Sequence, residues 1–123
     1  MPKHDDWIFF AEEDLVAADV LICAGLVAAS LYHCQQAVEK ALKGFLVAKG
    51  HDPRRTHDLI GLTRLCIKEE EVFEDILDDV AEINPFSTQT RYPDDLYHIP
   101  DLDYARIILA LADKIVHFVK MNI

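Results

Sequence analysis

Apolar residues recur at three- and four-residue intervals along nearly the whole chain, and this spacing excludes most sheet architectures. The clearest case is a stripe near the C-terminal end, made of Ala105, Ile108, Ala112, Ile115 and Val119. Such spacing puts side chains on one face of a helix, whereas a half-buried strand needs strict alternation. The sequence therefore predicts an all-α fold, an up-and-down antiparallel helical bundle of four to five helices.

Local signals predict where the first two helices begin and end. Asp5 and Asp6 are candidate caps for a first helix, because an aspartate can accept hydrogen bonds from a helix N-terminus. Gly25 is its expected stop. Ser30 is the candidate cap of a second helix, which should end before Gly50.

The second half of the chain predicts two shorter helices, a long loop and a last helix. The second of the shorter helices is expected over residues 70–82. Residues 84–100 include three prolines, which remove backbone donors and so exclude a long helix there. The last helix should begin at Asp101 or Asp103 and run to about Met121.

The length of 123 residues predicts a single domain over residues 1–123. The longest apolar stretch, Val20 to Leu31, is shorter than the roughly 20 residues that a bilayer span needs. The N-terminal segment MPKHDDW lacks the order of a signal peptide. We therefore expect a cytoplasmic protein without a membrane segment.

Cysteines and histidines give no sign of a metal centre. Cys23, Cys34 and Cys66 form no close pair, and they are predicted to be reduced core residues. The histidines lack a partner at metal-ligand spacing that recurs on a second element. The sequence predicts no metal site and no cofactor.

Charge is sorted along the chain. The net charge of −10 argues against indiscriminate binding to nucleic acid. Residues 31–68 nevertheless carry seven Lys or Arg against three acids, a net of +4. Residues 69–103 carry twelve acids against one arginine, a net of −11. One region could therefore meet an anion while the other repels anions or meets a basic partner.

Lys40, Lys43 and His57 are candidate phosphate contacts. The two lysines lie about one turn apart, and His57 opens a predicted helix, whose N-terminus favours anions. Exposed lysines are commonly only solvated, since phosphate recognition needs groups from several elements. Glu39 and Lys40, with the neighbouring glutamines, could equally form a polar patch inside an interface, and His57 could bond a backbone carbonyl.

Arg91 and His98 are a second candidate pair, in the segment RYPDDLYH. Histidine titrates near neutrality and can act as base or acid, and arginine can hold a phosphate bidentately. Metal-independent RNA cleavage requires a base, an acid and a cation, and this pair, doubled across a two-fold axis, would supply two of each group. An arginine ion-paired with Asp94 or Asp95, beside a histidine bonded to loop backbone, explains the spacing as well.

Four segments in order resemble the HEPN domain family, whose name stands for higher eukaryotes and prokaryotes nucleotide-binding. They are Trp7 with AEEDLVAADVL, then HCQQAVEKALKGFLV, then THDL, then RYPDD before a final amphipathic helix. The resemblance runs from about Trp7 to Val119 and is to the RYPD-containing prokaryotic branch.

This resemblance implies a helical bundle that forms a homodimer in a bacterium or archaeon. It also implies a minimal nucleotidyltransferase partner in a toxin–antitoxin-type module. Many members are metal-independent endoribonucleases with an arginine followed, after a short spacer, by a histidine. Six residues separate Arg91 from His98, so Arg91 would bind the scissile phosphate and His98 would act as base or acid.

In the nuclease members the residue after the arginine is usually polar, whereas Tyr92 follows Arg91 here. The RYPD branch looks more like the nucleotide-binding members, in which Lys40, Lys43 and Arg91 would contact phosphate. The first prediction is therefore a dimer that binds nucleotide or RNA phosphate. The alternatives are an active endoribonuclease toxin and a non-catalytic structural interaction module.

Overall fold

The computed structural model describes residues 2–52, 55, 58–87, 93 and 99–123. Its α-helices are α1 (His4–Cys23), α2 (Val27–Ala48), α3 (Leu59–Glu69), α4 (Leu77–Ile83) and α5 (Leu102–Asn122). Two short 3-10 helices, η1 (Glu71–Ile76) and η2 (Asn84–Ser87), flank α4. No strand occurs in these residues, so the predicted all-α class is confirmed.

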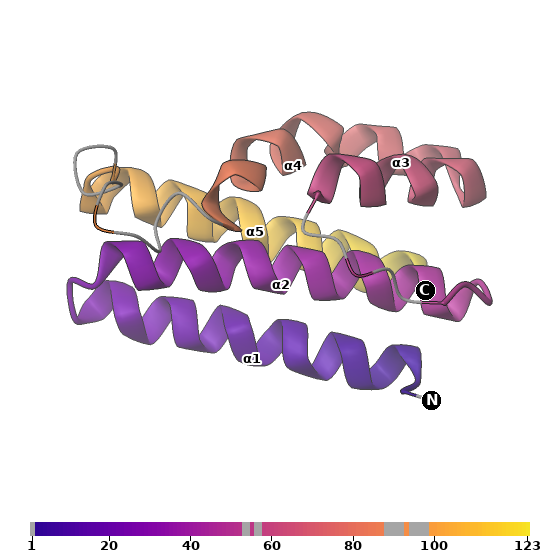
Figure 1. The fold of residues 1–123 in the computed structure, drawn as a ribbon, viewed down its shortest axis with the longest axis horizontal. Helices are drawn as coiled ribbons and strands as arrows, with labels where there is room; N and C mark the ends of the chain where they lie inside the picture. The colour runs from indigo at the N-terminus through magenta and orange to yellow at the C-terminus, as the bar shows by residue number, and fades with distance from the viewer. Residues whose placement is uncertain (1, 53–54, 56–57, 88–92, 94–98) are drawn as a thin grey trace.

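The three long helices lie side by side, and the shorter ones cover them on one side (Figure 1). α1 and α2 are antiparallel neighbours joined by a tight turn, and α5 runs behind them. α3, η1 and α4 form a second layer above α2 and α5. α2 contacts each of the other four α-helices, which makes it the centre of the bundle. The predicted up-and-down helical bundle is thus confirmed.

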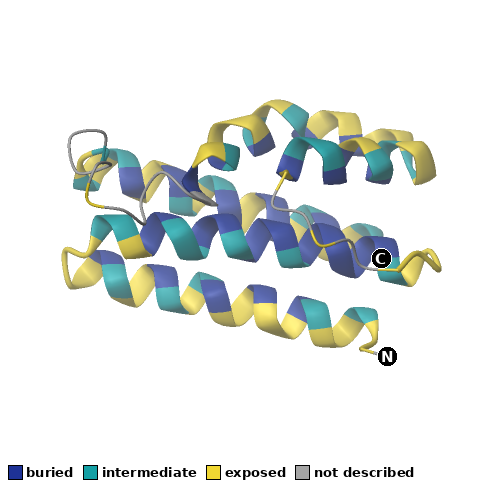
Figure 2. Ribbon diagram, viewed as in Figure 1, coloured by how far each residue is buried: buried dark blue, intermediate teal, exposed yellow. Residues whose placement is uncertain are grey.

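The core lies along α2, where most residues are buried on all sides (Figure 2). Three phenylalanines join the two layers. The Phe45 and Phe73 ring centroids are 4.3 Å apart, and those of Phe73 and Phe118 are 5.2 Å apart. Since these rings come from α2, η1 and α5, burying their large apolar surfaces holds the second layer onto the long helices.

Gly25 and Gly50 end α1 and α2 as the sequence predicts. Both have positive φ, +77° and +87°, which glycine adopts without the strain that a Cβ would cause. The N–H groups of Gly25 and Leu26 bond to the carbonyls of Ile22 and Leu21. Gly50 and the residue after it repeat this pattern, so both helix ends are Schellman motifs.

Ser30 does not cap α2, contrary to the prediction. The Gly25 turn is so short that α2 begins at Val27, and Ser30 falls inside its first turn. There its hydroxyl is buried and donates to the carbonyl of Ala18, 2.8 Å away on α1. Ser30 therefore joins two helices instead of starting one.

Other boundaries differ less from the prediction. α1 begins at His4 with Lys3 in the cap position, so the prediction that Asp5 or Asp6 caps it is wrong; Asp6 lies in the first turn, where its carboxylate accepts the backbone N–H of Lys3 at 2.8 Å. The predicted helix over 70–82 is divided into η1 and α4. Asp101 caps α5 as expected, accepting the N–H of Tyr104 at 2.8 Å. Within the described residues, no helix has the length and apolar character needed to cross a bilayer.

Only two of the three cysteines are core residues. Cys34 and Cys66 are buried, and burial raises the pKa of each thiol to about 12. A thiol with such a pKa stays protonated at neutral pH and is a poor nucleophile. Cys23 is exposed on the last turn of α1, so its predicted core position is wrong.

Gly25→Ala should destabilise the protein by about 1–2 kcal/mol, because alanine must adopt a left-handed conformation at this turn. Gly25→Asn is the matched control, since asparagine tolerates that conformation, and it should cost less. Urea unfolding measures both. Equal stability of the alanine variant and the wild type would contradict the assigned turn.

Candidate functional site: a polar cluster between α1 and α2

One face of α2 carries three buried polar side chains, one helical turn apart. Gln35, Glu39 and Lys43 are 0%, 5% and 6% exposed. Lys43 Nζ lies 3.1 Å from Glu39 Oε2, and Gln35 Nε2 lies 3.4 Å from Glu39 Oε1. Burying an unpaired charge costs several kcal/mol of folding free energy. Glu39 and Lys43 can therefore be buried here only because each neutralises the other.

Asp14 of α1 forms the second centre of the cluster. The residue is 7% exposed, and its carboxylate uses both oxygens. Lys40 Nζ lies 2.6 Å from Oδ2, and His33 Nδ1 lies 2.8 Å from Oδ1. Because the two partners are on α2, Asp14 joins the helices as well as balancing a positive charge. We call Asp14, His33, Gln35, Glu39, Lys40 and Lys43 the α1–α2 polar cluster.

Aromatic rings of α1 cover the two lysines. Lys43 Nζ lies 6.0 Å from the Trp7 ring centroid, and Lys40 Nζ lies 5.9 Å from that of Phe10. Trp7 comes close to α2 because residue 44 is a glycine, where an added Cβ would lie 3.0 Å from Trp7 Cβ. The Trp7 Nε1 atom is buried without a hydrogen-bond partner in the described part of the chain.

The predicted site residues fall into two groups. Lys40 and Lys43 are in the α1–α2 polar cluster, where each is already paired with a carboxylate. Lys43 is buried, and Lys40 is partly exposed, so neither ammonium is a free surface charge. Arg91, His98 and His57 lie outside the described residues, and their roles stay predictions. In the described residues, no cluster of His, Cys, Asp or Glu suits a metal ion.

Asp14 is the member of the cluster that sequence reasoning missed. Its signal is its position, seven residues after Trp7 and four before Ala18, which places it on the inward side of α1. A buried carboxylate on the apolar side of a helix needs a cation beside it, and the partly buried Lys40 on the neighbouring helix supplies one.

Comparison with known proteins places the chain in a family. The family model described as HEPN domain matches residues 4–122. The chain belongs to the HEPN domain family. The sequence resemblance is therefore confirmed over almost the full length of this HEPN chain.

Solved structures agree with this assignment. TT1696 of Thermus thermophilus superposes on the HEPN chain with a TM-score of 0.87 at 30% identity, over 100% of both chains. ST0689, described as an archaeal HEPN homologue, gives a TM-score of 0.81 at 27% identity, over 99% of this chain and 98% of its own.

A curated relative comes from the archaeon Methanocaldococcus jannaschii and bears the name "Putative toxin MJ1304". It is 33% identical over 91 residues, which are 68% of this HEPN chain. The match spans 59% of the relative's own length.

Glu39→Ala should destabilise the protein by about 3–5 kcal/mol, because it leaves the Lys43 ammonium buried without its carboxylate. Replacing both residues, Glu39→Leu with Lys43→Met, should restore most of the loss. Asp79→Ala is the surface control, since its partner Lys114 is exposed, and it should cost less than about 1 kcal/mol. Urea unfolding gives all three values. A double variant as unstable as Glu39→Ala would contradict the account.

Proposed function

We propose that this chain is a toxin-like HEPN protein that binds a phosphate of RNA or of a nucleotide through Arg91. In this proposal the protein works in the cytoplasm of a prokaryote, as a homodimer, with a minimal nucleotidyltransferase as its partner. Family membership supports the general class, and the name of the Methanocaldococcus relative supports the toxin-like role.

The state of the two described lysines supports Arg91 as the principal phosphate contact. Lys40 and Lys43 are neutralised by Asp14 and Glu39 at 2.6 Å and 3.1 Å, and this is the observation on which the choice rests. Arg91, by contrast, is the only Lys or Arg among residues 69–103. A guanidinium offers paired donors that match two phosphate oxygens, whereas an ammonium is a point charge.

Cleavage of the bound RNA is the second candidate function. Arg91 and His98 in one short segment, and a relative named as a toxin, favour it. Arg91 would stabilise the charge that develops on the scissile phosphate, and His98 would transfer a proton. Tyr92, directly after the arginine, is the residue that favours binding over cleavage.

Arg91→Ala should weaken the binding of a fluorescein-labelled single-stranded RNA and of ATP by about tenfold or more, since a charge-assisted contact contributes about 1.5–3 kcal/mol. Fluorescence anisotropy measures the RNA, and calorimetry measures ATP. Arg64→Ala is the matched control, because Arg64 is an exposed arginine of α3, and it should bind as the wild type does.

Lys40→Met separates the two candidate sites. Unchanged binding supports Arg91, and a loss equal to that of Arg91→Ala would contradict the choice made here. The same samples, incubated with total RNA with EDTA or with Mg²⁺, decide the second function. Cleavage by the wild type that disappears in both Arg91→Ala and His98→Ala establishes a nuclease, and RNA left intact leaves a binding protein.

A further inference from the structure

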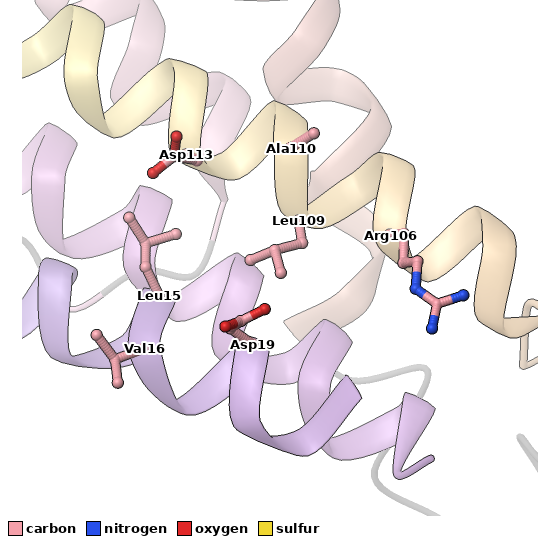
Figure 3. Close-up of a pocket in the computed structure, with 7 residues that line it drawn as sticks. All are labelled: Leu15, Val16, Asp19, Arg106, Leu109, Ala110 and Asp113. Atoms are coloured by element: carbon pink, nitrogen blue, oxygen red, sulfur yellow. The ribbon is translucent and has the colours of Figure 1, made fainter. Parts of the chain in front are cut away.

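A groove of about 450 Å³ lies between α1 and α5, on the side of the bundle away from α3 and α4 (Figures 1 and 3). Leu15 and Leu109 reach into it from the two helices, and Ala110 leaves room because its side chain is small. Arg106 lies at one end of the groove, toward the start of α5. The floor is thus apolar and open to solvent.

Exposed apolar side chains of α1 continue this surface beyond the groove. Val16, which lines it, is 62% exposed, and Phe9 and Val20 are 56% and 61% exposed. Their spacing of seven and four residues puts all three on one side of α1. A contiguous row of large apolar side chains exposed to water is more typical of an interaction surface than of the rest of a protein surface.

Carboxylates without a partner line the same groove. Asp19 and Asp113 are exposed, and neither has an ion-pair partner in the part of the chain that the structure describes. α1 carries six acids and no Lys or Arg. Each of the three Lys or Arg residues of α5 already has an acidic partner: Asp103 for Arg106 at the end of the groove, Asp79 for Lys114, and Glu12 of α1 for Lys120.

This charge decides against a second copy of the chain as the occupant. Packing α1 against α1 would bring the exposed acids of a second α1, Asp19 among them, to a surface whose Lys and Arg side chains, among the described residues of these helices, are already paired. Like charges brought together at an interface cost several kcal/mol, so a cationic occupant is favoured.

We propose that the α1–α5 groove binds a cationic amphipathic helix of a partner protein. Its apolar side chains, spaced at i and i+4, would lie against Leu15 and Leu109. Its lysines or arginines would pair with Asp19 and Asp113. The groove extends about 10 Å along α5, from Arg106 to Asp113, which is long enough for two turns of a bound helix. Binding of an amphipathic helix in an apolar groove is a common recognition mode, and this site is independent of Arg91.

Two designed peptides test this proposal. Both are alanine-rich, capped helices with two leucines at i and i+4, and they differ only in flanking lysines or flanking glutamates. The lysine peptide should bind the wild type in calorimetry, more weakly as salt is added. It should lose tenfold or more in affinity for the double variant Asp19→Lys, Asp113→Lys. The glutamate peptide should show the reverse preference.

Glu71→Lys with Asp75→Lys is the matched control, because it makes the same charge change at exposed positions of η1, in the other layer. Circular dichroism checks that all variants fold. Equal loss of lysine-peptide binding in both double variants would mean unspecific charge attraction and would overturn the proposal. So would the failure of the wild type to bind either peptide. A dimer that Ala110→Trp dissociates, seen by analytical ultracentrifugation, would make a second copy the occupant and would overturn it too.

Discussion

The need to neutralise buried charge between α1 and α2 governs the arrangement of this bundle. Asp14 can be buried only where Lys40 and His33 of α2 meet its oxygens, whereas Glu39 has its partner Lys43 one turn away on α2 itself. Apolar burial is non-directional, so it specifies the register of α1 on α2 less sharply than a charged contact does. The Asp14 contacts favour one register, and the close approach of Trp7 at Gly44 fits the same one.

The same constraint divides the surface into regions with different chemistry. Lys40 and Lys43 give positive charge to α2, yet that charge is balanced by carboxylates instead of being free for a ligand. The outer side of α1 is left acidic and apolar, with Asp19 beside Val16. A phosphate ligand and a cationic helix would therefore bind different parts of the molecule. Both proposals follow from which charged side chains are already paired and which are not.

The fold could be predicted from the sequence because its signals are local. Gly25 and Gly50 end their helices through their own backbone conformation, whatever the helices pack against. Asp101 caps the helix that follows it in the same local way. Ser30 and Asp14 could not be assigned in this way, since their partners lie on another helix. The division of residues 70–82 into η1 and α4 also has no local signal that we can identify.

The candidate site was predicted less completely. The residue types near Lys40 indicated a polar patch. Only the folded structure shows that Lys40 and Lys43 each have a carboxylate partner there. Arg91 and His98 are known from spacing and resemblance alone, because they lie outside the described residues.

A double-mutant cycle on Asp14 and Lys40 tests the central claim most directly. Asp14→Asn, Lys40→Met and the double variant would be unfolded in urea beside the wild type. We expect a coupling energy of about 1 kcal/mol or more, because the contact joins an almost buried carboxylate to an ammonium at 2.6 Å. If the losses in unfolding free energy of the two single variants sum to that of the double variant within about 0.3 kcal/mol, the pair does not hold α1 on α2. That result would contradict the account.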